Sequence, residues 1–187
     1  MSAPRPALQQ QAEALRQAFD SSFAQPLAEA GAAPDDYLAI RVADDPHVLR
    51  LAEIASLLPL RTVTRLPSPL PALLGIVGFR GSIVPLYDLR SLLGYPAGPD
   101  GDNTPRWMVI TAALPLGLAF DAFEGHWRQP RTASAPPVAG PARAHVRELL
   151  AGTDAGAGAP RPVLSVASLL AAIQDLARAH PGQQEER

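Results

Sequence analysis

LLGIVGFRGSIVPLYDLRSLLG, at residues 73–94, holds two apolar runs of β type on either side of a glycine-spaced turn that carries one arginine. The pattern predicts a β-hairpin with a type II turn over Phe79-Arg80-Gly81-Ser82. A type II turn requires a positive φ at its third position, which glycine adopts most readily. Arg80 then stands at the exposed corner of the turn, which makes it a candidate for contact with a partner.

The composition indicates one domain with short extensions. A chain of 187 residues has room for one core or two small lobes that share it, and a net charge of -2 gives no basic surface for nucleic acid or anionic membranes. No apolar run is long enough to span a bilayer, and the N-terminus lacks a signal-peptide pattern. We therefore expect a cytoplasmic protein that neither inserts into a membrane nor binds nucleic acid.

Two residue types are missing from the chain. It contains no cysteine, and all 16 of its basic residues are arginine, so it has no lysine. Thiolate chemistry, lysine Schiff bases and a Walker-type phosphate loop are therefore excluded.

The first 34 residues predict a helical extension. Apolar residues three and four positions apart give residues 7–24 one apolar helical face. The residues of this face are Leu8, Ala12, Leu15, Phe19 and Phe23. Two roles fit such a helix: packing against its own domain, or docking to a partner, which includes self-association with a second copy of the chain.

The rest of the chain reads mostly as short strands. The predicted strands, besides the hairpin above, cover 37–42, 48–51, 61–66, 107–112, 116–123, 146–150 and 162–165. Residues 51–58 instead predict a short helix from their apolar spacing, ended by Pro59. A second helix is predicted at 166–177 with Ser165 as its N-cap, followed by a disordered polar tail at 178–187. Many short strands between turns predict the all-β class, built as small barrels.

The chain shows no catalytic constellation. Gly75, Gly78 and Gly81 continue into a strand rather than a helix, which argues against a nucleotide-binding loop. Asp88 is expected to cap a short helical turn that begins at Leu89, and Asp121 to be structural. The four histidines are scattered, without metal-ligand spacing. We expect no enzyme activity, no metal and no cofactor, and a hydrolase using these aspartates lacks a nucleophile or an oxyanion donor.

The hairpin resembles the most recognisable segment of CheW-like domains, the adaptor modules of bacterial chemotaxis. The family pattern is Leu-Gly-(Val/Ile)-x-Asn-x-Arg-Gly-x-(Val/Ile)-(Val/Ile)-Pro-(Val/Leu)-x-Asp-Leu-Arg. The matching residues are Gly75, Arg80, Gly81, Val84, Pro85, Asp88, Leu89 and Arg90. The resemblance covers 37–173 and implies two five-stranded, SH3-like barrels that share a core, within a domain at residues 35–177.

The resemblance also implies partners and contact residues. Arg80 would contact the helical tip of a chemoreceptor's cytoplasmic part, with Val77 and Phe79 nearby. The apolar run from Ile83 through Val84 to Leu86 would contact the regulatory domain of a CheA-type histidine kinase. Gly75 and Gly81 belong to the same contact region, while Pro85, Asp88 and Asp121 would be structural. The implied function is a non-enzymatic adaptor that couples receptor to kinase.

The chain departs from the family pattern at three positions, and an alternative function stays open. Gly78 replaces the usual asparagine, Phe79 replaces a leucine or valine, and Ser165 stands where aspartate is frequent. These departures affect the choice of partner. The alternative is a small-molecule sensor, whose pocket between the lobes would have Trp107 and Trp127 as walls and whose tryptophan fluorescence would respond to ligand.

Overall fold

The computed structural model describes residues 34–96, 104–129, 134–135, 144–151 and 159–179. The predicted N-terminal helix at 7–24 lies outside these residues, as does the tail from residue 180 onward. Of the helices in the described ranges, none is long and apolar enough to cross a membrane.

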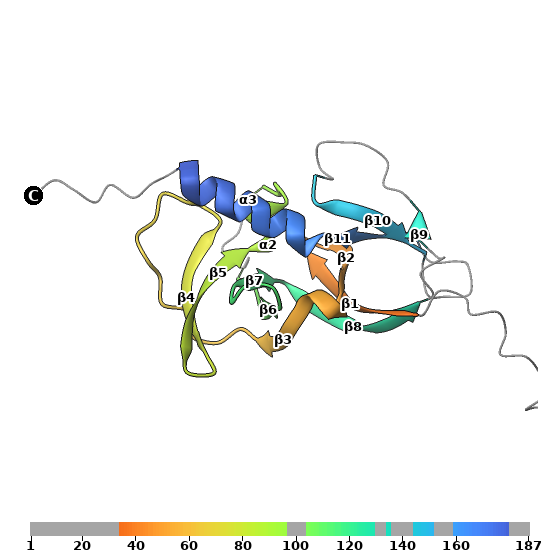
Figure 1. Cartoon of the computed structure of the whole chain (residues 1–187), viewed down its shortest axis with the longest axis horizontal. Helices are drawn as coiled ribbons and strands as arrows, with labels where there is room; N and C mark the ends of the chain where they lie inside the picture. Colours follow the sequence, from red (N-terminus) through yellow and green to blue (C-terminus); the bar gives the residue numbers. More distant parts are fainter. Residues whose placement is uncertain (1–33, 97–103, 130–133, 136–143, 152–158, 180–187) are drawn as a thin grey trace, which may run out of the picture. The chain divides into compact units, whose positions relative to one another are not determined.

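The described residues form two antiparallel-rich sheets and few helices (Figure 1). A six-stranded sheet has the order β8-β1-β2-β11-β10-β9, and a five-stranded sheet has the order β3-β6-β7-β5-β4. The strands are β1 Asp35–Val42, β2 Asp45–Arg50, β3 Ile54–Pro59, β4 Leu73–Phe79, β5 Ser82–Asp88, β6 Trp107–Thr111, β7 Gly117–Phe120, β8 Ala122–Gln129, β9 Ser134–Ala135, β10 Val146–Leu150 and β11 Arg161–Leu164. The helices are η1 Leu51–Glu53, α2 Leu89–Leu92 and α3 Val166–Ala179.

One hydrophobic cluster joins the two sheets, which confirms the predicted all-β fold with a shared core. It combines Leu38, Ile40 and Leu49 of the six-stranded sheet with Val109 and Leu118 of the five-stranded sheet. Helix α3 covers this cluster with its buried residues Val166, Leu169, Leu170 and Ile173. Its N-terminus is capped as predicted, because the Ser165 hydroxyl accepts from the Ser168 amide at 3.3 Å.

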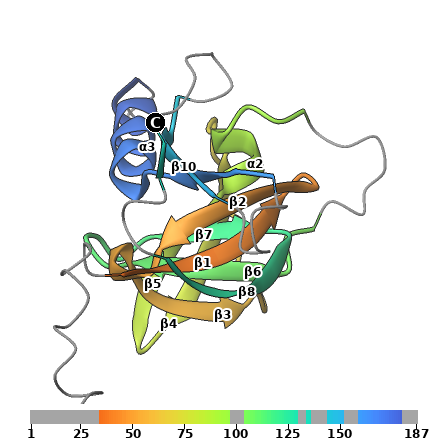
Figure 2. The ribbon, with the colours of Figure 1, turned by 90° about the vertical axis from the view of Figure 1, so that its right-hand side faces the viewer.

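Each sheet also encloses a cluster of its own. The five-stranded sheet surrounds Val77, Val84, Leu86, Met108, Ile110 and Ala119. The six-stranded sheet surrounds Tyr37, Ala39, Val48, Leu150 and Val163, with Trp127 against them. Figure 2 shows β3 and β4, the two ends of the five-stranded sheet, at the same lower side of the molecule. The sheet therefore curls around its cluster.

The β4–β5 hairpin forms as predicted, but its turn is of another type. Phe79 pairs with Ser82 across a loop of two residues, and both of these have positive φ: 48° at Arg80 and 81° at Gly81. Positive φ at both positions defines a type I′ turn, so the predicted type II turn is wrong. A type I′ turn is favoured because its twist matches the right-handed twist of the two strands.

The predicted helix at 51–58 is also wrong. Only Leu51–Glu53 is helical, as one turn of 3-10 type, and Ile54–Pro59 is strand β3. The strand pairs with β6, with Leu57 opposite Val109. A short apolar run fits a helix or a strand equally well by its spacing, and pairing with a distant strand decides between them. The predicted strand at 61–66 reduces to one bridge, between Thr64 and Ile76.

Candidate functional site

A groove lies between the two edge strands of the five-stranded sheet, and we call it the hairpin groove. Its volume is about 390 Å³. Its lining comes from β3, β4, β6, the loop after β3 and the β4–β5 turn: Ser56, Leu58, Pro59, Arg61, Thr62, Val77, Gly78, Phe79, Arg80 and Met108. The side chains of the lining are apolar apart from two hydroxyls and two guanidinium groups, and they include no carboxylate.

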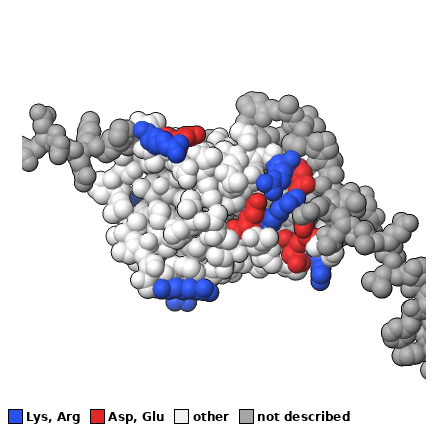
Figure 3. Space-filling view, in the orientation of Figure 1, with Lys and Arg blue, Asp and Glu red and all other residues white. Residues whose placement is uncertain are grey.

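Arg80 lies at the rim of this groove, at the tip of the hairpin. Its side chain is exposed, and its Cζ lies 5.0 Å from the centroid of the Phe79 ring, in cation–π contact. Within the described ranges its guanidinium has no ion pair. Figure 3 shows basic atoms at the hairpin tip with uncharged residues around them, whereas acidic and basic side chains mix over the six-stranded sheet. Arg80 is therefore a cation available to a partner.

The other residues predicted to contact partners divide into two groups. Ile83 has 74% of its surface exposed, and Gly81 is exposed at the turn with space around its Cα. Val84 and Leu86, predicted as contact residues, are fully buried inside the five-stranded sheet and expose no side chain to a partner. Strand residues alternate between faces, and these two point inward while Ile83 points outward.

The other two predicted contact residues, Val77 and Gly75, lie deep in the lobe. Val77 is 6% exposed and reaches a partner only as part of the floor of the hairpin groove. Gly75 is buried, with a φ of 142°, and a Cβ there would lie 2.2 Å from the carbonyl oxygen of Thr64. Gly75, predicted as a contact residue, therefore admits the loop that runs beside β4.

A second groove lies where the two sheets meet, and we call it the junction groove. It has a volume of about 560 Å³ and a mostly apolar lining. η1, the β6–β7 turn and α3 supply this lining: Ala52, Glu53, Ala112, Ala113, Leu114, Val166, Ala167, Leu170, Ala171 and Gln174. Leu114 in this lining is 42% exposed, and Leu51, which precedes Ala52 in η1, is 38% exposed. The two grooves lie at opposite ends of β3.

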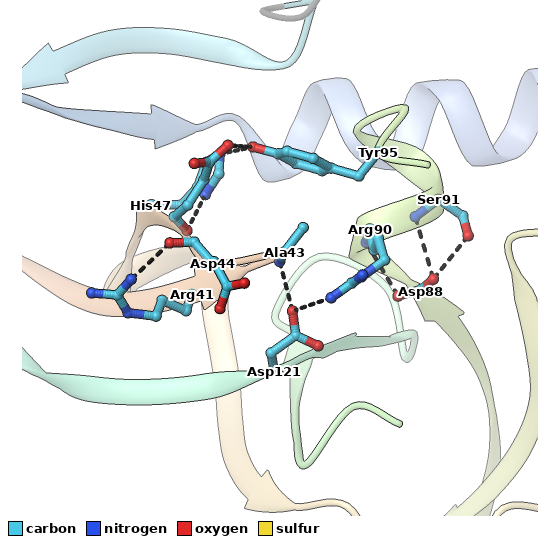
Figure 4. A network of polar contacts seen from close by, with 10 residues as sticks. Arg41, Ala43, Asp44, His47, Asp88, Arg90, Ser91, Tyr95 and Asp121 are labelled. Atoms are coloured by element: carbon cyan, nitrogen blue, oxygen red, sulfur yellow. Dashed lines mark hydrogen bonds and ion pairs between the residues drawn. The ribbon is translucent and has the colours of Figure 1, made fainter. Parts of the chain in front are cut away.

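Asp88 and Asp121 have structural contacts (Figure 4). The Asp88 carboxylate accepts from the amides of Arg90 and Ser91 at 3.1 and 3.3 Å, which makes it the N-cap of α2. Asp121 Oδ2 accepts from the Ala43 amide at 2.6 Å and from Arg90 Nη2 at 3.1 Å. Since Ala43 belongs to the β1–β2 turn and Arg90 to α2, Asp121 ties the two sheets together.

A second polar contact lies nearby and joins the segment after α2 to the start of β2. The Tyr95 hydroxyl donates to Asp45 Oδ2 at 2.7 Å, and His47 Nδ1 donates to the Asp45 carbonyl at 3.1 Å (Figure 4). Burial, followed by this hydrogen bond and the Asp45 charge, raises the pKa of Tyr95. Burial lowers the pKa of His47 below its ordinary value of 6.5, although Asp45 opposes the change. His47 is therefore a neutral, structural histidine.

The six-stranded sheet carries a separate group of ion pairs. Glu124 binds Arg41 at 2.6 Å and also Arg161, whose Cζ lies 4.4 Å from the centroid of the Trp127 ring. Partial burial raises the pKa of Glu124, but the hydrogen bonds and charges of Arg161 and Arg41 outweigh it and hold the pKa below its usual value. Among the described residues, the two guanidinium groups of this ion-pair group are therefore neutralised by Glu124, unlike that of Arg80.

The geometry behind the alternative function is absent from the described residues. Trp107 packs on the cluster between the sheets and against Phe123, at 5.6 Å between ring centroids. Trp127 is partly buried and packs against the cluster of the six-stranded sheet. The two tryptophans therefore line no common pocket. No group of three potential metal ligands occurs in the part of the chain that the structure describes.

Sequence reasoning missed Arg61 and Met108. Arg61, predicted in a strand, lies in a loop at the hairpin groove, exposed and with no ion pair to any described residue. One signal in the sequence points to it: residues 54–87 contain three arginines and no aspartate or glutamate. Any carboxylate that pairs with these arginines has to come from outside the segment.

The comparisons with known proteins agree with this architecture of two sheets with an exposed hairpin. The family model of the CheW-like domain matches residues 36–174, so the chain belongs to the CheW-like domain family. The family is one of scaffold and adaptor domains in chemotaxis, and membership supports such a role here.

A solved structure shows the same fold. It is the scaffolding protein TtCheW from Thermoanaerobacter tengcongensis, with 19% sequence identity and a TM-score of 0.60. The match covers 71% of this chain and 90% of that one. A comparison with curated proteins found no match.

Proposed function

We propose that this chain is a non-enzymatic adaptor that couples a chemoreceptor's cytoplasmic helical tip to the regulatory domain of a CheA-type histidine kinase. One observation carries the proposal. A hairpin displays an exposed guanidinium that no described residue pairs with and, three residues on, an isoleucine that is 74% exposed. Arranged on one rigid hairpin, a charge and an apolar side chain suit contacts with proteins, which bind through apolar anchors and complementary charges.

The two partners use different surfaces of the protein. The receptor's helical tip lies in the junction groove, whose apolar lining suits the apolar face of a helix, and extends along β3 to Arg80. The kinase's regulatory domain contacts the outer face of the hairpin around Ile83. Because the shared core and the hydrogen bonds of Asp121 join the two sheets, the adaptor fixes the distance and orientation between its partners.

The test is a reconstituted assay of receptor-controlled kinase autophosphorylation. Arg80→Glu should abolish receptor control while the protein stays folded, because the reversed charge repels the carboxylate that Arg80 meets. The matched control is Arg65→Glu, since Arg65 is exposed in the same lobe but does not line the hairpin groove. Unchanged control of the kinase by Arg80→Glu would refute the receptor contact.

A further inference from the structure

We propose that the hairpin groove is a two-arginine site for a protein segment in which apolar side chains stand between carboxylates, with Arg61 as the second cation beside Arg80. The inference deepens the proposed function by naming the chemistry of the partner at this groove. The inference rests on the proposed function in one respect only, which is that the partner is a protein.

The floor of the groove selects apolar side chains. Leu58, Val77, Phe79 and Met108 line it, and at about 390 Å³ it has room for one or two large side chains of a partner. Met108 is 5% exposed and Val77 is 6% exposed, so both form a floor rather than a rim. An unbranched, polarisable methionine adapts to partner side chains of differing shape.

The two guanidinium groups select carboxylates. Arg61 and Arg80 are both exposed and both line the groove, whose lining includes no acidic residue. Among the described residues neither has an ion pair. The surrounding segment, residues 54–87, holds Arg65 as well and has no aspartate or glutamate, although the whole chain has a net charge of -2. A guanidinium beside an apolar surface binds a carboxylate in paired hydrogen bonds that are strengthened by the charge.

The edge of β4 supplies a third kind of contact. The amide and the carbonyl of Ile76 bond Thr64, each at 2.9 Å, so they point away from β5. Main-chain groups alternate along a strand, and those of Gly78 therefore point to the same open side. No described strand covers that side of Gly78, and nothing lies within 4 Å of where its Cβ would be. A segment held by the two arginines meets a free donor and acceptor there.

The experiment measures binding of labelled peptides by fluorescence anisotropy, with the full chain as receptor. The first probe is a short peptide in which a central Leu-Phe pair is flanked by glutamates. The second has glutamine at every glutamate position, and the third keeps the glutamates but has Ser-Ser at the centre. The protein variants are Arg61→Gln and Arg80→Gln, with Arg65→Gln as the matched control outside the groove.

The acidic, apolar peptide should bind more tightly than both of the other probes. Arg61→Gln and Arg80→Gln should each weaken its binding about three- to tenfold, and Arg65→Gln less than about twofold. The difference between the acidic and glutamine peptides should shrink as salt is raised. No binding of the acidic peptide, equal binding of all three probes, or an equal effect of Arg65→Gln would overturn the proposal.

The two proposals fail separately. The titration uses neither receptor nor kinase, so a negative result leaves the adaptor function to be judged by the coupling assay. Loss of coupling in Arg80→Glu together with normal coupling in Arg61→Glu would retain the adaptor and overturn the second cation.

Discussion

Replacing Arg80 by asparagine separates the cost of its backbone conformation from its role in binding. A φ of 48° is unfavourable for an ordinary L-residue by about 1–2 kcal/mol. Asparagine tolerates this conformation, and Asn-Gly is the preferred pair of a type I′ turn. Arg80→Asn should therefore relieve about 0.5–1 kcal/mol of strain.

The substitution also removes one contact, which sets the net effect. The cation–π contact with Phe79 is exposed and contributes about 0.5 kcal/mol. The expected net change in the free energy of unfolding lies between zero and about 0.5 kcal/mol in favour of the variant. Receptor control of the kinase should nevertheless be lost, since asparagine carries no charge.

The prediction is tested by measuring both urea unfolding and receptor control of the kinase for Arg80→Asn. The midpoint should stay constant or rise with an unchanged m value, while coupling falls. A loss of more than about 1 kcal/mol at constant m would show that Arg80 is a structural residue, and the reasoning from strain to function would fail.

Three further results are expected. Asp121→Ala should lower the free energy of unfolding in urea by about 1.5–3 kcal/mol, because it leaves the Arg90 guanidinium and the Ala43 amide without their acceptor. A loss below about 0.5 kcal/mol would show that Asp121 does not hold the two sheets together. Because the pKa of His47 is lower in the folded protein, the unfolded chain takes up the proton first as the pH falls. The contribution of His47 to the free energy of unfolding should therefore be fully present above pH 6.5 and decrease below it, and His47→Gln should lose less stability over that range. Equal dependence of stability on pH in both proteins would exclude His47 as the cause. Removing residues 1–33 should preserve the fold, and a change from dimer to monomer in sedimentation would identify the predicted helix there as the self-association element.

Local chemistry made part of this structure predictable. The β4–β5 hairpin, the Asp88 cap and helix α3 with its Ser165 cap depend on neighbours within a few residues, and each appears where the pattern predicted it. Strand β3 was missed because its pairing partner, β6, lies about fifty residues away in the sequence. Spacing alone does not reveal such a partner.

The sequence predicts the exposed charge of Arg80 at the candidate site, but it does not predict which face of each strand is buried. Alternation along β5 shows that Ile83 and Val84 point to opposite sides, yet only packing in three dimensions decides which side is buried. Arg61 enters the site because its loop folds beside β4 through the Thr64 bridge, a contact without a local signature. The partners of Asp121 lie 78 and 31 residues away and were equally invisible.

The position of Arg80 relative to the six-stranded sheet follows from a continuous chain of fixed elements. β5 leaves the hairpin and ends at Asp88, whose carboxylate starts α2. Arg90 in α2 reaches Asp121, which holds the Ala43 amide of the β1–β2 turn, and Tyr95 beyond α2 holds Asp45 in strand β2. A rotation of the hairpin against the other sheet would have to break these hydrogen bonds or the shared core. An adaptor that transmits the arrangement of its partners would need such resistance, and this need gives Asp45, Asp88 and Asp121, which line neither groove, a part in the proposed function.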